Sequence, residues 1–162
     1  ALTLVACGEA EEEVLAYEDV EACIKAGQQE ETVCRTEFDK AQKLHENVAP
    51  RYNSVRNCNS DFGYDRCYRS RSSGGSFWLP FMVGYMLAPR LGPRYISSQP
   101  LYRPSSNPNS FYTAANGRVG SVSATGRTKL AESQVKRPAA RTRTVARGGF
   151  GARAASRRSA GG

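Results

Sequence analysis

The chain has little of what catalysis and metal binding usually require: its 162 residues include one histidine, one tryptophan and two methionines. A single histidine excludes metal sites built from two or three imidazole ligands. No nucleophile elbow and no glycine-rich phosphate loop precedes an expected helix. We therefore predict that the protein is not an enzyme and uses no cofactor, and we assign no catalytic residue and no metal ligand.

Acidic residues are almost absent from the second part of the chain. Residues 1–50 contain twelve acidic and four basic residues, whereas residues 51–162 contain three acidic and nineteen basic residues. The mean hydropathy of −0.54 is low for a chain that buries a large core. The composition predicts a small acidic head joined to a long basic tail. The longest apolar window falls far short of the roughly 20 residues that a membrane-spanning helix needs.

The first residues are typical of the end of a secretory signal. An apolar run ends in Leu4-Val5-Ala6-Cys7, and acidic residues begin at Glu9. This run is similar to the lipobox of bacterial lipoproteins, in which cleavage precedes the cysteine and the cysteine is lipidated. We expect residues 1–6 to be the end of a signal peptide, Cys7 to carry the lipid and residues 7–17 to be an acidic spacer. The alternative is a buried strand or helix that ends at Cys7.

The residue after Cys7 indicates a location. Gly8, in place of Asp, resembles the enterobacterial pattern for sorting to the outer membrane. Each buried CH₂ of an acyl chain contributes about 0.8 kcal/mol, so two or three chains make the attachment effectively permanent. We therefore expect a lipid-anchored protein of the cell envelope, on the periplasmic face of the outer membrane.

The other four cysteines, Cys23, Cys34, Cys58 and Cys67, are expected to form two disulfides. An even number of cysteines in a short exported segment is typical of a disulfide framework. The gaps between them are too wide for the close Cys pairs of structural zinc sites. Two connectivities stay open. We favour the local pairs 23–34 and 58–67, because each joins neighbouring elements across a single turn, over the nested pairs 23–67 and 34–58.

Residues 18–68 are expected to form a compact helical head that the disulfides staple. Apolar residues at helical spacing predict helices over 18–26 and 30–47, and a third short helix is capped by Asn53 or Ser54. The predicted fold is a small α-helical, disulfide-stapled head, followed by a mostly irregular or disordered region with one β-hairpin.

A Ser/Gly/Arg linker over 69–76 precedes the most apolar window of the chain, residues 77–88. Three interpretations compete: the window packs on the head, lies in a membrane interface or docks into a partner protein. We favour the second and third, because a helix starting at Pro80 would carry apolar residues on several faces outside the head. The expected membrane or partner contacts are the aromatic and methionine side chains Phe77, Trp78, Phe81, Met82, Tyr85 and Met86.

The remaining residues are expected to contain little regular structure. Residues 89–120 are rich in Pro, Ser and Asn, and Asn116-Gly117 predicts a type I′ hairpin turn within 111–120. Residues 121–162 contain a single acid and are expected to be a disordered basic tail. The tail is expected to contact an anionic envelope surface through Arg141, Arg143, Arg147, Arg153, Arg157 and Arg158. The same arginines resemble RNA-binding segments, so nucleic-acid binding is the alternative if the chain is not exported.

Several sequence blocks recur together in one group of bacterial proteins. They are Cys23-x₁₀-Cys34 with Cys58-x₈-Cys67, Ala49-Pro50-Arg51-Tyr52, residues 75–86 (GSFWLPFMVGYM), Gln99-Pro100-Leu101-Tyr102, the Tyr112…Gly117 segment, residues 144–151 (TVARGGFG) and the closing Gly161-Gly162. With these blocks the chain resembles the YgiB-like family of uncharacterised bacterial envelope lipoproteins. The resemblance covers nearly the whole chain after Cys7 and implies an exported lipoprotein. It carries over no catalytic residue, since none is established for the family.

These patterns together predict a non-enzymatic, lipid-anchored protein of the bacterial cell envelope that acts by binding, as a scaffold or a tether. Its expected partners are the membrane, through the acyl anchor, and an anionic envelope surface or an envelope protein.

Overall fold

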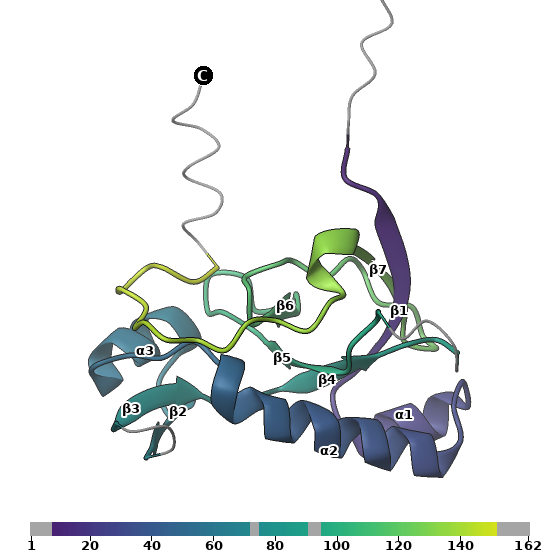
Figure 1. Ribbon diagram of the computed structural model, residues 1–162, viewed down its shortest axis with the longest axis horizontal. Helices are drawn as coiled ribbons and strands as arrows, with labels where there is room; N and C mark the ends of the chain where they lie inside the picture. Colours follow the sequence, from purple (N-terminus) through teal and green to yellow (C-terminus); the bar gives the residue numbers. More distant parts are fainter. Residues whose placement is uncertain (1–7, 72–74, 91–94, 152–162) are drawn as a thin grey trace, which may run out of the picture.

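A computed structural model describes residues 8–71, 75–90 and 95–151. The elements follow the order β1 (Glu11–Tyr17), α1 (Val20–Ala26), α2 (Glu31–Val48), α3 (Val55–Phe62), β2 (Cys67–Ser70), β3 (Phe77–Pro80), β4 (Gly84–Leu87), β5 (Gln99–Tyr102), β6 (Tyr112–Thr113), β7 (Arg127–Ala131) and a short 3₁₀ helix, η1 (Glu132–Gln134). Figure 1 shows α1 and α2 on one side of the sheet strands, and residues 132–151 on the other side.

Two antiparallel sheets organise the chain. Five strands form one sheet in the order β6-β5-β4-β1-β7, while β2 and β3 pair separately. The strand nearest the N-terminus, β1, therefore lies between β4 and the last strand, β7. The expected helical head followed by a mostly irregular region is wrong. Strands from both ends of the chain share one sheet, and local sequence patterns carry no information about such distant pairing.

The helices agree with the sequence because their ends carry strong local signals. The Asp19 side chain accepts a hydrogen bond from the Ala22 backbone N–H at the start of α1, and Gly27 takes the left-handed conformation (φ 68°) that ends it. The Ser54 side chain accepts a hydrogen bond from the Asn57 N–H at the start of α3. All three predicted helices are present, within a residue or two of their expected limits.

The two disulfides are confirmed, with the local connectivity. Cys23–Cys34 joins α1 to α2, and Cys58–Cys67 joins α3 to β2. Each closes a loop of about ten residues, which in the chain-entropy account stabilises the fold by on the order of 3 kcal/mol.

The apolar window 77–88 is part of the fold. It forms β3 and β4 rather than a helix starting at Pro80, and every residue of β4 is buried. Tyr85 and Met86 are fully buried, so the expectation that they contact a membrane or partner is wrong. A central strand that is buried on both faces is a continuous apolar run, and so is a segment that docks to a membrane or a partner. Apolar composition alone therefore does not distinguish the two.

Residues 121–151 are also part of the fold rather than a disordered tail. After β7 and η1, residues 135–151, which we call the C-terminal segment, run across the side of the molecule opposite α1 and α2 (Figure 1). Backbone hydrogen bonds join Arg141 N–H to the Asn47 carbonyl and Val145 N–H to the Arg51 carbonyl. The segment ends with Phe150 buried among aromatic rings, those of Phe62, Tyr102 and Tyr112. The low apolar content of these residues did not indicate this packing, because the single large side chain of Phe150 provides most of it.

The predicted hairpin within 111–120 is present, with a different turn. Tyr112 pairs with Arg118, and the Thr113 N–H donates to the Gly117 carbonyl. A type I′ turn needs a positive φ at both of its central residues. Asn116 has a positive φ of 69°, but the φ of Gly117 is not positive. The loop therefore contains three residues, closed by the left-handed Asn116.

Replacing Phe150 tests whether the C-terminal segment completes the core. We expect Phe150→Ala to lower the free energy of unfolding by about 3–5 kcal/mol, because it removes a ring that is 2% exposed. Urea unfolding of the oxidised protein, followed by Trp78 fluorescence, measures the change. Arg143→Ala in the same segment is the control, with an expected effect within about 0.5 kcal/mol. A loss below 1 kcal/mol for Phe150→Ala would mean that the segment does not pack on the core.

Candidate functional site

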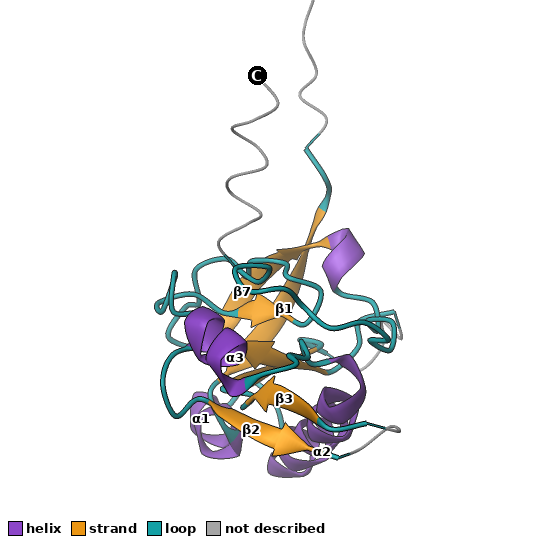
Figure 2. Ribbon diagram, turned by 90° about the vertical axis from the view of Figure 1, so that its left-hand side faces the viewer, coloured by secondary structure: helices purple, strands orange, loops and turns teal. Residues whose placement is uncertain are grey.

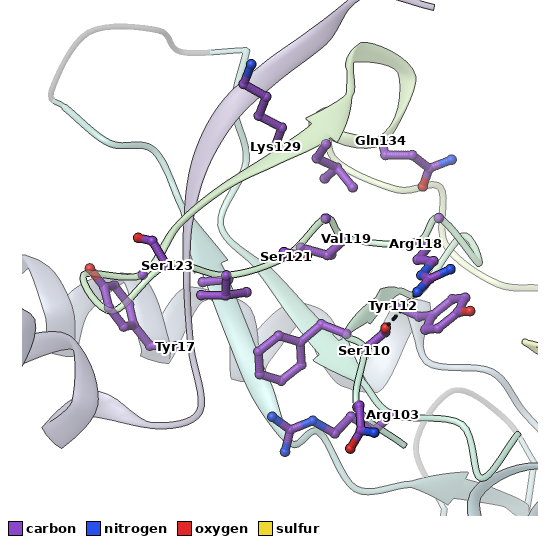
Figure 3. Close-up of a pocket in the computed structure, with 18 of the residues that line it drawn as sticks. Tyr17, Arg103, Ser110, Tyr112, Arg118, Val119, Ser121, Ser123, Lys129 and Gln134 are labelled. Carbon is purple, nitrogen blue, oxygen red and sulfur yellow. Dashed lines mark hydrogen bonds between the residues drawn. The ribbon is translucent and has the colours of Figure 1, made fainter. Parts of the chain in front are cut away.

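An open groove of about 1550 Å³ is present in the described structure. It lies beside β1 and β7 and is bordered by α1, by the residues around the hairpin and by residues 119–126 (Figure 3). Side chains able to form hydrogen bonds line much of it: Asn109, Ser110, Asn116, Ser121, Ser123 and Gln134. These residues come from segments that are far from β1 in the sequence, so the groove exists only in the folded chain.

One wall of the groove is fastened to β1 at several points. The Tyr17 hydroxyl donates to the Thr125 carbonyl over 2.7 Å, and the Ala16 N–H donates to the Gly126 carbonyl over 2.9 Å. Gly126 has φ 88°, and an added Cβ would lie 2.3 Å from the Tyr17 ring. Only glycine fits here, both for conformation and for space. The wall is therefore a fixed surface rather than a free loop.

Two arginines of the groove are held differently. The Arg103 guanidinium lies 4.3 Å from the centre of the Phe111 ring and forms an ion pair of 2.9 Å with Glu18. Arg118 is exposed, and its guanidinium donates to the Ser110 hydroxyl over 3.3 Å. Figure 3 shows Arg118 and Ser110 directed toward each other. Arg103 thus has its charge balanced within the fold, whereas Arg118 has no carboxylate partner among the described residues.

The single histidine lies in a separate buried cluster between α2, β2 and β5. His45 is 5% exposed, its Nδ1 lies 2.6 Å from the Tyr102 hydroxyl, and its Nε2 lies 2.8 Å from the Tyr68 hydroxyl. The Tyr68 hydroxyl in turn donates to the Glu46 carboxylate over 2.7 Å. Since Tyr68 has one hydrogen to donate, it accepts from His45 Nε2–H, and Nδ1 accepts from Tyr102. The cluster is a one-directional chain from Tyr102 to Glu46.

Burial favours the neutral imidazole in this cluster. Burial lowers the pKa of His45 to about 4, and the negative charge of Glu46 opposes the shift only in part. Burial also raises the pKa of Tyr102 well above its ordinary value and, together with the hydrogen bond to Glu46, raises that of Tyr68. His45, Tyr68 and Tyr102 are therefore uncharged at neutral pH. We interpret His45 as a structural residue that joins α2 to β5.

The expected contact residues of the apolar window separate in the structure. Phe77, Trp78 and Met82 are half-buried, and Phe81 is 50% exposed, with its ring stacked on Tyr68 at 4.8 Å between centres. Phe77 is covered by the Arg51 guanidinium at 5.1 Å. Of the six, Phe81 is the exposed one, and one face of its ring is covered by Tyr68.

The arginines expected to contact an anionic surface also separate. Arg141 is partly buried and donates to the Ala114 carbonyl over 2.6 Å, so it holds the fold together and is not a surface contact. Arg143 and Arg147 are exposed. Arg153, Arg157 and Arg158 lie outside the described residues, as does Cys7. Phe150, the aromatic residue of the RNA-like segment, is buried and not available to stack on a base.

Within residues 8–71, 75–90 and 95–151, no three His, Cys, Asp or Glu side chains are grouped so that they could hold a metal ion. None of the helices in that part of the chain has the length and apolar composition to cross a membrane.

Comparison with known proteins assigns a family. The family model described as "Protein of unknown function (DUF1190)" matches residues 11–161. The chain belongs to the DUF1190 family. A UPF0441 protein from Klebsiella pneumoniae is 32% identical over 165 positions, which cover 91% of this chain and 74% of the relative. UPF0441 proteins from Erwinia tasmaniensis (32% identical) and Yersinia pestis (28%) have the same coverage. No solved structure matches the chain significantly.

The DUF1190 match confirms the resemblance that the sequence blocks indicate. It begins at Glu11, the first residue of β1, and includes the C-terminal segment, so the family unit contains both chain ends that complete the sheet and core. No sequence signal pointed to the groove, because its lining residues are ordinary polar residues of segments that looked irregular.

The titration of His45 gives a test of the buried cluster. The folded-state pKa of about 4 lies below the ordinary 6.5, so the unfolded chain binds a proton first as the pH falls. The contribution of the neutral His45 to the free energy of unfolding is fully present above pH 6.5. It falls by about 3 kcal/mol as the pH drops from 6.5 to 4. Unfolding free energies measured across this range should fall more steeply for the native protein than for His45→Gln, which does not titrate. Parallel curves for the two proteins would show that His45 is not buried as a neutral group.

Proposed function

We propose that this DUF1190 protein is exported, is anchored to a membrane of the cell envelope through a lipid on Cys7, and acts by binding rather than by catalysis. The observation that carries the proposal is the pair of disulfides, Cys23–Cys34 and Cys58–Cys67. Disulfides persist in oxidising compartments outside the cytoplasm. The fifth cysteine, Cys7, ends the run Leu4-Val5-Ala6-Cys7, which is similar to a lipobox.

The fold sets how close an anchored domain would lie to the bilayer. The strand β1 begins at Glu11, four positions after Cys7, in place of the longer acidic spacer expected over 7–17. Four residues span at most about 14 Å. A lipid on Cys7 would therefore hold the sheet directly at the membrane surface, which supports a role at that surface rather than at a distance from it.

Basic side chains on one side of the molecule support an anionic membrane surface as the partner. In Figures 1 and 2 both ends of the described chain lie on the same side, and the C-terminal segment runs along it. That segment exposes Lys136, Arg137, Arg143 and Arg147. Each Lys or Arg near an anionic bilayer contributes about 1 kcal/mol to the free energy of membrane binding. The exposed carboxylates of Glu9 and Glu11 are repelled by the same surface and reduce the total. The C-terminal segment would act as a basic surface fixed on the fold, and not as a flexible basic coil.

Two neighbouring substitutions test the anchor and the location. In cells of its own host, Cys7→Ser should abolish labelling by a fatty-acid analogue and release the protein from membranes, because the lipidated thiol is gone. Gly8→Asp should keep the label but move the protein from the outer to the inner membrane, because it changes only the sorting residue. Labelling followed by membrane fractionation measures both. A Cys7→Ser protein that keeps its label would contradict the proposed anchor.

A further inference from the structure

We infer that the groove beside β7 binds a phosphate-bearing saccharide, with Arg118 and Ser110 contacting the phosphate and Lys129 contributing a second positive charge. The inference rests on the binding role proposed above, to which it adds a chemical class of ligand. It does not depend on the lipid at Cys7.

The size and lining of the groove favour a polar, extended ligand. A volume of about 1550 Å³ exceeds the roughly 300–1,000 Å³ of pockets for single small molecules. Its hydroxyl and amide side chains, such as Ser121, Ser123 and Asn109, are exposed and match the alternating donors and acceptors of sugar hydroxyls. The rings of Phe111 and Tyr112 at the groove are buried, so polar groups rather than an aromatic platform form its surface.

The charges of the groove favour a negative group on that ligand. Arg118, Lys129 and Lys25 border it and are exposed, and none of them forms an ion pair among the described residues, although Lys129 lies opposite Glu13 in the sheet. The acidic residues are Glu9, Glu11 and Glu18. Glu18 is paired with Arg103, whereas Glu9 accepts a hydrogen bond from the neutral Ser133 N–H and keeps its negative charge. Three bases against the carboxylates of Glu9 and Glu11 leave the lining with a small excess of positive charge, and Arg118 carries part of it beside Ser110.

Arg118 is positioned to use its charge. The Ser110 hydroxyl accepts one hydrogen bond from Nη2 of the guanidinium. Within the described ranges no other acceptor is recorded for the guanidinium, so its remaining N–H groups can bind a phosphate, and the hydroxyl hydrogen can donate beside them. The hairpin that carries Arg118 is fixed by the Thr113 hydroxyl, which accepts from the Gly117 N–H and donates to the Gln134 side chain over 2.7 Å. A guanidinium on a fixed turn loses little freedom when it binds a phosphate.

Such a ligand has two sources in an envelope: the headgroup of a glycolipid, or a phosphorylated glycan that is not part of a membrane. Glu9 and Gly151, at the two ends of the described chain, both line the groove. The groove therefore opens on the side that a lipid on Cys7 would hold toward the bilayer.

Direct binding measurements test the ligand class. The full chain carrying Cys7→Ser is titrated with a glucosamine disaccharide that bears a phosphate at each end, with the same disaccharide lacking phosphate, and with inorganic phosphate. Backbone amide shifts locate the site. We expect the phosphorylated disaccharide to bind most tightly, to shift the amides of Ser110, Arg118 and Lys129, and to bind about tenfold more weakly to Arg118→Gln.

The control is Arg143→Gln, which removes the same charge from an exposed position of the C-terminal segment, outside the groove lining. An equal loss for Arg118→Gln and Arg143→Gln would overturn the site, because it would show attraction to overall charge. Equal binding of the disaccharide with and without phosphate would overturn the ligand class, as would no binding of either form. Unchanged amide spectra outside the groove show that each variant folds.

Vesicles that display the same phosphorylated disaccharide as a lipid headgroup distinguish the two sources. Tighter binding to these vesicles than to the free disaccharide assigns the groove to a membrane glycolipid, whereas equal binding assigns it to a free glycan. Because the protein used lacks Cys7, failure here leaves fatty-acid labelling of Cys7 unaffected, and loss of labelling leaves this titration unaffected.

Discussion

The position of the C-terminal segment depends on the Asp61 carboxylate. Its two oxygens accept a hydrogen bond of 2.6 Å from the Tyr52 hydroxyl and one of 2.9 Å from the Gly148 N–H, and the residue is buried. A buried carboxylate must be satisfied by donors, so Gly148 is fixed beside α3. Phe150, two residues further, then enters the aromatic cluster, and the Gly151 N–H reaches the Asn116 side chain of the hairpin. One buried acid thus connects α3, the core and the rim of the groove.

Much of the first half of the fold follows from local chemistry. Asp19, Ser54 and Gly27 terminate helices by hydrogen bonds or backbone conformations that involve only neighbouring residues, so the sequence alone locates these ends. The disulfides follow from the same logic, since each cysteine pair joins elements that are adjacent in the chain. These features need no knowledge of distant residues.

The sheet, the C-terminal segment and the groove could not be predicted because distant contacts create them. Tyr17 and Thr125, which fasten the groove wall, are 108 residues apart. The strand β7 does show alternation, with Thr128 and Leu130 buried between exposed Arg127 and Lys129, but that period of two was hidden in an arginine-rich region. No local pattern predicts the burial of Phe150, a single aromatic residue among glycines. Its burial depends on the rings of Phe62 and Tyr102, which are distant in the sequence.

Strand pairing brings acidic and basic segments from the two halves of the chain together. The acid-rich strand β1 lies antiparallel to the basic strand β7, with Glu13 directly opposite Lys129 and in an ion pair with Arg127. These pairs are exposed, so each contributes little to stability. Their effect is on register, because opposite charges attract across neighbouring strands and like charges repel. The acidic and basic parts of the sequence are therefore not separate units, because the acidic strand β1 pairs with the basic strand β7. The bases that pairing leaves over, among them Arg118, are the ones free to meet a ligand.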